Sequence, residues 1–198
     1  MTGYTEHPQA FPPAYLRTLA RQIRASPCFT THTLNRDFVG TRGFSVVFRR
    51  SALGEVVHAF PFFQPYLERA LRADCDAFYL NPLELQQGSR VDPHIDRSLR
   101  SYCRTVAPPA LVSVLYVEVP RSMEGGELVL RRGKKHLARI RPAVNSLVLF
   151  EGDLTHSIER VESAGSRLSL VCEQYCLTPE ESEQIPEYAV ETRARAYD

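Results

Sequence analysis

A run of apolar and β-branched residues, Leu111-Val112-Ser113-Val114-Leu115-Tyr116-Val117, begins the part of the chain that decides its fold. Similar short runs follow at close spacing, and turns such as Gly125-Gly126 and Ala164-Gly165 separate them. Many short strands with no helices between them are typical of a β-sandwich or jelly roll. We therefore expect short strands at residues 77–80, 83–85, 111–117, 127–130, 136–140, 146–150, 156–161 and 167–175.

The N-terminal part of the chain shows helical periodicity instead. Residues 14–23 carry apolar side chains at helical spacing behind two prolines, which suit the entrance of a helix. Residues 54–72 predict a second helical region, interrupted near Pro61 and Pro65 because proline breaks the hydrogen-bond ladder. Residues 44–48 predict a strand. The expected architecture is mainly β, with N-terminal helices packed against a two-sheet antiparallel barrel.

Length and composition fit one globular domain. The chain has 198 residues, of which 43% are apolar and 24% are charged. We expect a single domain spanning residues 1–198. In it, residues 1–75 support the core, 76–177 form the β core, and 178–198 form a short helix and a loose tail.

Charge and cysteine content argue against several classes of protein. Lys plus Arg total 24 and Asp plus Glu total 23, which argues against a nucleic-acid partner. The five cysteines include no C-x-x-C pair, so we expect no disulfide framework or structural zinc and predict a cytoplasmic protein. No apolar stretch approaches the ~20 residues needed to cross a bilayer, so we expect no membrane partner. The oligomeric state stays open.

Two histidines and an aspartate occur in an ordered pattern within the β-rich region. Val91-Asp92-Pro93-His94-Ile95-Asp96 contains a His-x-Asp pair, and His156 follows 60 residues after Asp96. Side chains alternate along a strand, so His94 and Asp96 can both point into a barrel. Two neutral imidazoles and one carboxylate are the ligands of a facial Fe(II) site, which leaves other iron positions open. The sequence therefore predicts that His94, Asp96 and His156 bind iron.

An arginine lies on the next predicted strand. Arg167 comes eleven residues after His156, and a turn near Gly165 would place the two on neighbouring antiparallel strands. Arginine stays charged and binds carboxylates in a bidentate manner, so Arg167 could hold an anionic co-substrate beside the metal. Ser169 and Tyr116 could donate hydroxyl hydrogen bonds to the same carboxylate. Each residue alone more often has a structural role, and the ordered combination is what favours an iron site.

The stretch 83–177 resembles the 2-oxoglutarate- and Fe(II)-dependent oxygenase superfamily, most closely its prolyl-4-hydroxylase-like branch. That branch has a glycine before His-x-Asp, a strand ending in tyrosine, a Gly-Gly-Glu turn, a Pro-x-x-Asn run and an Arg-x-Ser strand. Here these are Gly88, Tyr116, Gly125-Gly126-Glu127, Pro142-Ala143-Val144-Asn145 and Arg167-Leu168-Ser169. The branch often has a tyrosine three residues before the glycine, where this chain has Leu85.

This resemblance implies a double-stranded β-helix, a jelly-roll or cupin-like barrel. It implies that His94, Asp96 and His156 bind Fe(II), and that Arg167, with Ser169 and Tyr116, binds 2-oxoglutarate. It further implies a dioxygenase that consumes O2 and 2-oxoglutarate, hydroxylates an unactivated C–H bond, and releases succinate and CO2. Ascorbate is a candidate reductant. The expected substrate is an amino acid or a residue, proline first, in a peptide or protein, and a small metabolite is an equal candidate.

Two other functions stay open on the sequence. A non-catalytic barrel could bind or sense 2-oxoglutarate or oxygen, and a cupin-type metalloenzyme would use no oxo acid. Succinate release would separate the oxygenase from both. Hydroxylation, desaturation, cyclisation and demethylation share the same cofactor chemistry, so the sequence does not choose among them. For selectivity we look to segments 31–43 and 98–109, with the candidate side chains Arg42, Arg97, Arg100, Tyr102 and Arg104.

Overall fold

The computed structural model describes residues 3–31 and 37–192 of the chain. Its helices are α1 Pro13–Ala25, α2 Leu53–Ala59, α3 Gln64–Ala70 and α4 Pro179–Gln184, with 3-10 turns at Arg50–Ala52, Pro61–Phe63 and Ser98–Ser101. Its strands are β1 Tyr4–His7, β2 Thr30–Thr31, β3 Phe38–Gly43, β4 Ser45–Arg49, β5 Ala77–His94, β6 Leu111–Glu118, β7 Leu128–Arg132, β8 Lys135–Ile140, β9 Leu147–Phe150, β10 Thr155–Ile158, β11 Ser166–Tyr175 and β12 Tyr188–Glu191.

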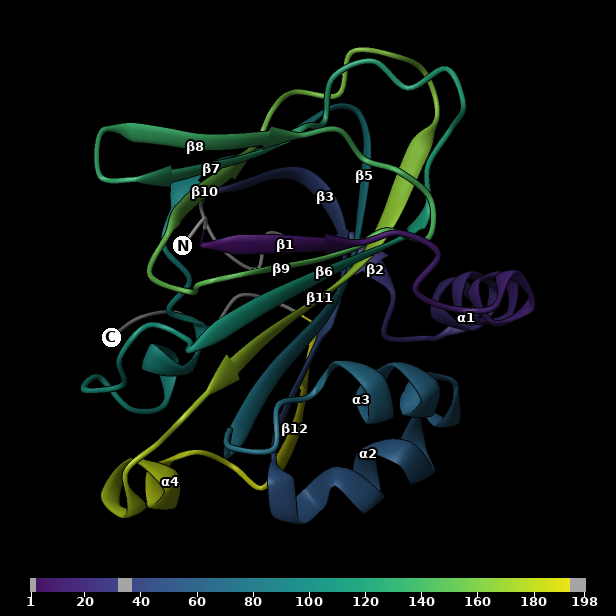
Figure 1. The fold of residues 1–198 in the computed structure, drawn as a ribbon. Helices are drawn as coiled ribbons and strands as arrows, with labels where there is room; N and C mark the ends of the chain where they lie inside the picture. Colours follow the sequence, from purple (N-terminus) through teal and green to yellow (C-terminus); the bar gives the residue numbers. More distant parts are fainter. Residues whose placement is uncertain (1–2, 32–36, 193–198) are drawn as a thin grey trace.

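The strands form one curled antiparallel sheet. Its main path runs in the order β1-β9-β6-β11-β5-β10-β7-β8, and the long strand β5 also pairs with β3 and β4 (Figure 1). Residues 77–86 of β5 pair with β11, whereas its last residues, 91–94, pair with β10. Gly88, with φ +85°, lies between these two parts, in a backbone conformation that favours glycine. Strand β5 therefore connects the two halves of the barrel, and the mainly β fold with N-terminal helices is confirmed.

Helix α1 carries its apolar residues on one side. Pro13 occupies its first turn, where a missing N–H costs nothing, and the chain leaves the helix at Ser26 in an extended conformation. Its buried residues are Leu16, Leu19, Ala20 and Ile23, at the helical spacing predicted from the sequence. Among the described residues, no helix is long and apolar enough to cross a membrane.

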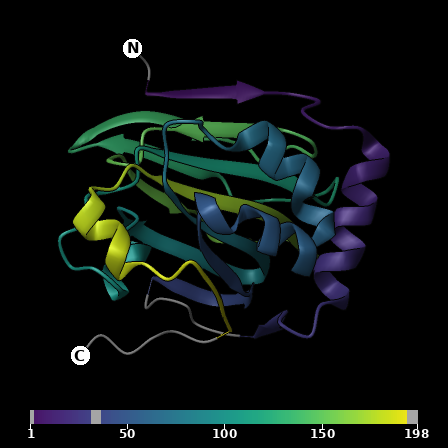
Figure 2. The ribbon, with the colours of Figure 1, turned by 90° about the horizontal axis from the view of Figure 1, so that it is seen from below.

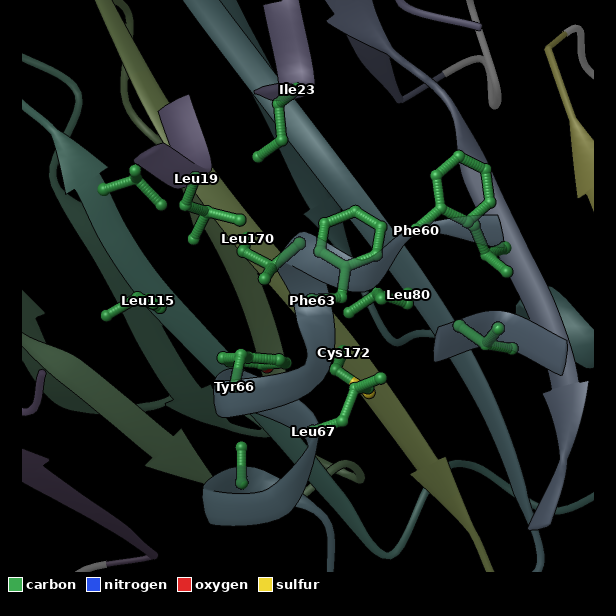
Figure 3. Close-up of a cluster of buried hydrophobic side chains, with 14 of the residues drawn as sticks. Leu19, Ile23, Phe60, Phe63, Tyr66, Leu67, Leu80, Leu115, Leu170 and Cys172 are labelled. Carbon is green, nitrogen blue, oxygen red and sulfur yellow. The ribbon is translucent and has the colours of Figure 1, made fainter. Parts of the chain in front are cut away.

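Helices α1, α2 and α3 cover one face of the sheet (Figures 1 and 2). Side chains alternate along a strand, so Leu168, Leu170 and Cys172 of β11 all belong to the core beneath these helices. Figure 3 shows Leu19 and Phe63 meeting the strand residues of this core. Polar contacts also lie inside it, among them a 2.7 Å hydrogen bond between the hydroxyls of Tyr66 and Ser113. This face of the sheet is apolar, and its buried hydroxyls are paired.

The opposite face of the same strands lines the interior of the barrel. Val112, Val114 and Tyr116 of β6 alternate with the residues that face the helices, and they pack with Val148 and Phe150 of β9 in a second apolar cluster. One sheet thus separates the core under the helices from the interior of the barrel. The candidate site lies on the interior side.

The observed strands confirm most of the predicted ones, with two differences. The predicted strands at residues 77–80 and 83–85 are one strand, β5, because Pro82 lies where the neighbour of β5 changes from β4 to β3. Proline has no N–H for a ladder hydrogen bond, so such a change of partner accommodates it. The prediction of a loose tail after the short C-terminal helix was wrong for residues 188–191, which form β12 against β4. The rest of that tail, 193–198, lies outside the described residues.

Candidate functional site

The three predicted metal ligands lie together inside the barrel. His94 ends β5 and is the register partner of His156 on β10, and Asp96 follows β5 directly. The Asp96 carboxylate lies 3.1 Å from Nε2 of His94 and 3.4 Å from Nε2 of His156. One ligand atom from each residue falls within 4.8 Å of the others. This spacing suits three ligands on one side of a single metal ion.

Both imidazoles are oriented by the backbone. Nδ1 of His94 lies 2.8 Å from the Asp92 carbonyl oxygen, and Nδ1 of His156 lies 3.2 Å from that of Leu154. A carbonyl oxygen only accepts, so each Nδ1 carries the proton. Each Nε2 then presents its lone pair in the neutral ring, which is the form that binds a metal.

The pKa values of Asp96 and His94 are strongly shifted within this group. Burial acts to raise the pKa of Asp96, but His156 and His94 outweigh it and hold that pKa below its usual range. Burial acts to lower the pKa of His94, but hydrogen bonding and attraction to Asp96 raise it to about 9. The carboxylate therefore stays ionised, and the proton on the His94 imidazole holds the place that a divalent cation would take.

These ligands border a cavity of about 870 Å³ that also receives side chains from the neighbouring strands. Arg167, Ser169 and Glu173 line it from β11, because alternate residues of a strand share one face. Tyr116 lines it from the adjacent strand β6 and pairs with Ser169 in register. The predicted metal ligands and the predicted co-substrate residues thus share one enclosed space.

Arg167 is a buried cation whose hydrogen-bonding capacity is only partly used. The side chain is 1% exposed, and its Nη1 donates to the carbonyl oxygen of Gly126 at 2.8 Å. Its guanidinium lies 5.2 Å from the centre of the Tyr116 ring. Burial lowers the pKa of Arg167, and Tyr116 acts in the opposite direction. Within the described part of the chain, Nε of Arg167 and the hydroxyls of Ser169 and Tyr116 have no hydrogen-bond partner.

Buried polar groups without partners are rare in folded proteins, because each costs free energy. A guanidinium and two hydroxyls lie together in one cavity, and a carboxylate accepts hydrogen bonds from donors of this kind. The residues present therefore fit both halves of the predicted complex, an iron ion on the His-Asp-His group and a dicarboxylate reaching Arg167.

Some of the candidate selectivity residues line the cavity and others do not. Arg97 and Arg100 line the cavity, whereas Arg42 does not. Arg42 instead lies 3.4 Å from the Glu84 carboxylate and covers the Phe29 ring. Tyr102 donates to Glu191, a residue that does line the cavity, and Arg104 is not among the lining residues. The prediction of a loop at 31–43 was wrong for residues 38–43, which form strand β3 against β5, and residues 32–36 lie outside the described residues.

The sequence interpretation missed two buried polar residues of the cavity, Glu173 and Asn81. Each is 4% exposed and lines the interior. Glu173 follows Arg167 and Ser169 at even spacing on one strand, and that parity was the signal that could have found it. Asn81 gave no such signal, because it falls between the predicted strands 77–80 and 83–85, whereas it lies within the continuous strand β5.

Comparison with known proteins supports the same assignment. Residues 79–172 match the family model of the 2OG-Fe(II) oxygenase superfamily, and a search of curated proteins found no match. Among solved structures, a Pseudomonas putida prolyl-4-hydroxylase aligns with TM-score 0.61 and 18% identity, covering 89% of this chain and 94% of that one.

Two further structures share the fold. A Trichoplax adhaerens prolyl hydroxylase, in complex with a peptide fragment of the hypoxia inducible factor oxygen degradation domain, aligns with TM-score 0.58 and 12% identity, covering 92% of this chain and 87% of that one. HygX from Streptomyces hygroscopicus, with nickel, 2-oxoglutarate and hygromycin B bound, aligns with TM-score 0.55 and 11% identity, covering 87% of this chain and 82% of that one. At these identities the likeness concerns the fold.

The matched segment contains all three clustered ligands as well as Arg167, Ser169 and Tyr116. Its fold is the double-stranded β-helix expected from the sequence. Residues 79–172 match the 2OG-Fe(II) oxygenase superfamily, and this match together with the clustered ligands indicates an oxygenase that uses Fe(II), 2-oxoglutarate and O2.

Proposed function

We propose that this oxygenase hydroxylates an unactivated C–H bond of an amino acid or of a residue in a peptide or protein, with a prolyl residue as the first candidate. The observation that carries the proposal is the single cavity that holds the His-Asp-His group and the partly unpartnered Arg167. Iron bound with 2-oxoglutarate supplies the oxidising chemistry, with release of succinate and CO2.

In this proposal the protein's own residues bind and orient. His94, Asp96 and His156 hold the iron, and the backbone carbonyls behind the imidazoles keep each Nε2 aimed at it. Arg167 binds the far carboxylate of 2-oxoglutarate, and the hydroxyls of Ser169 and Tyr116 donate to the same group. The burial of all three residues removes water from this end of the cavity, which strengthens the charged contacts.

The substrate class has two candidates. Two proteins of the same fold are prolyl hydroxylases, one of them bound to a peptide, which supports a prolyl substrate. HygX, bound to hygromycin B, has the same fold around a small molecule. The buried polar residues Glu173 and Asn81 favour a small polar substrate as the second candidate, since an apolar prolyl ring would leave the Oδ1 of Asn81 without a partner and Glu173 without a cation.

The first test is anaerobic. Fe(II) and then 2-oxoglutarate are added to metal-free protein, and the weak visible charge-transfer band of the iron chelate is recorded. We expect the band in the wild type, its loss in His94→Ala, and a weaker band at equal 2-oxoglutarate in Arg167→Ala. His136→Ala is the matched control, because His136 is exposed on β8 outside the cavity. If the wild-type protein is folded and loaded with iron but shows no charge-transfer band, the proposal is contradicted.

The second test measures turnover. Succinate release is scored with prolyl peptides, free amino acids and amino sugars, and the product is identified by its mass. A gain of one oxygen atom in a prolyl peptide would support the first substrate class, and the same gain in a free amino acid or amino sugar would support the second. Loss of two hydrogens or of a methyl group would replace hydroxylation by desaturation or demethylation.

A further inference from the structure

The cavity has a second polar end that the iron and 2-oxoglutarate residues leave unused. Glu173 lies six residues beyond Arg167 on the same face of β11, which corresponds to about 20 Å along a strand. A buried guanidinium and a buried carboxyl thus occupy different ends of one enclosed space. The metal ligands line the same space.

The Glu173 carboxyl is oriented by neutral donors alone. The Ser98 hydroxyl donates to one carboxyl oxygen at 2.6 Å, and the Ser98 N–H and the Tyr175 hydroxyl donate to the other. These partners keep the group in place but bring no positive charge. No Lys, Arg or His pairs with Glu173 among residues 3–31 and 37–192.

Such a carboxyl is poorly suited to ionise without a ligand. Burial, reinforced by the charge of Asp96, raises the pKa of Glu173 to about 8. A buried carboxylate is stabilised when a cation lies against it and its remaining lone pairs are hydrogen-bonded. The hydrogen bonds are already present, so a cation is the missing component.

Asn81 supplies an independent observation beside it. The Ser45 hydroxyl donates to the Tyr79 oxygen at 2.7 Å, so the same Ser45 oxygen accepts from Nδ2 of Asn81 at 3.4 Å. This fixes the orientation of the amide, whose Oδ1 is buried without a partner among the described residues. The side chain lines the cavity and carries one acceptor without such a partner.

The strand register brings these two acceptors close together. Glu173 pairs with Tyr79 across β11 and β5, so Asn81 is its diagonal neighbour on the same face. Diagonal neighbours lie roughly 7–8 Å apart, within reach of one ligand group. Arg97 and Arg100 also line the cavity, but Arg97 is exposed and Nε of Arg100 donates to the Val106 carbonyl at 2.9 Å.

We propose that Glu173 and Asn81 bind an ammonium or guanidinium group of the substrate and so determine its class. The carboxylate balances the charge, and the two acceptors share the N–H donors of the cation. The substrate is then an amine or a guanidine that enters with its cation toward Glu173. This inference rests on the proposed function, because the ligand that it places at the second polar end of the cavity is the substrate of the proposed reaction.

The test measures binding of small probes and needs no known substrate. Protein loaded with Zn(II) and 2-oxoglutarate is mixed with matched pairs of probes, n-butylammonium against n-butanol and butylguanidinium against butylurea. Saturation-transfer NMR reports which probes bind. We expect transfer to a cationic probe and little to its neutral partner. We expect at least a fivefold loss of that transfer in Glu173→Gln and a smaller loss in Asn81→Leu.

Matched variants separate recognition from general damage. Glu162→Gln removes an exposed carboxylate outside the cavity and should leave the transfer unchanged. Equal transfer to cationic and neutral probes, no transfer to any probe, or full transfer in Glu173→Gln would each overturn the inference. The anaerobic iron band in Glu173→Gln shows that the variant is folded. That band is also the separate test of the proposed function, because its absence from the wild type would sink that proposal whatever the probes do.

Discussion

The two faces of strand β11 differ in how completely their polar groups are satisfied. Toward the helices, Leu168, Leu170 and Cys172 pack in an apolar core. Toward the cavity, Arg167 and Ser169 keep polar atoms that find no partner in the described part of the chain, although both are as deeply buried as the leucines. Both faces belong to one segment of ten residues, so local sequence composition does not explain the difference.

The contrast indicates what each face is for. A packed apolar face lowers the free energy of the folded chain by removing surface from water. A buried polar face without partners raises it, and it persists where a ligand supplies the missing contacts. We therefore expect changes on the helix face to act on stability, and changes on the cavity face to act on ligand binding.

The largest expected effect follows removal of a metal ligand. His156→Ala leaves two of the three ligands, so we expect iron affinity to fall by more than ~100-fold, beyond the range known for groups that only support a ligand. The free energy of unfolding of the metal-free protein should change far less. Competition with a chelator measures the affinity, and His136→Ala provides the control. Unchanged iron affinity in His156→Ala would place the metal elsewhere.

The next effect concerns the helix face. Leu170 is completely buried, so Leu170→Ala should lower the free energy of unfolding by about 2–5 kcal/mol, through lost burial and the cavity it leaves. Urea unfolding measures this change, while the iron band of the folded protein should persist. Val171→Ala, one residue along on the cavity face and only half-buried, should cost less. A cost for Val171→Ala equal to that for Leu170→Ala would remove the difference between the faces.

Ser169→Ala tests the cavity face in the same way. The Ser169 hydroxyl has no partner to lose, so the unfolding free energy without ligand should change by no more than ~0.5 kcal/mol. Affinity for 2-oxoglutarate should fall by about 0.5–1.5 kcal/mol, the net contribution of one hydrogen bond. Calorimetric titration of the Ni(II)-loaded protein with 2-oxoglutarate measures it. A Ser169→Ala variant that lost stability but kept full affinity for 2-oxoglutarate would contradict this expectation.

The last expected effect is a change in pH dependence. The pKa of Glu173 is raised to about 8 in the folded protein, so the folded state holds a proton that the unfolded chain releases at lower pH. Its contribution to stability is complete below the unfolded pKa and is lost as pH rises toward 8. In metal-free protein, the stability of the wild type relative to Glu173→Gln should therefore decline between about pH 5 and pH 8 and then level off. A difference independent of pH would show that Glu173 is ionised throughout.

Much of the fold could be predicted because its signals are local. The alternating runs of β6 and β11 and the apolar side of α1 follow from residue spacing alone. Strands β1, β2, β3 and β12 were not predicted; the residues of β1 and β12 are exposed or half-buried and carry little pattern. Segments β1 and β12 become strands because β9 and β4 offer unpaired edges to them.

Residue types and their order along the chain specify which side chains can do the chemistry. His-x-Asp, the distal histidine and Arg-x-Ser are properties of residue type and spacing, and they are sufficient to indicate the superfamily. The cytoplasmic location and the single-domain boundaries stay predictions from composition.

The folded chain was needed to establish that His94 and His156 meet, that Arg42 lies outside the cavity, and that Glu173 is buried within it. Spacing could not establish these points, because pairing and burial depend on contacts between distant segments. The sequence specifies each side chain, whereas the packed fold decides which of them lose water and which find a partner.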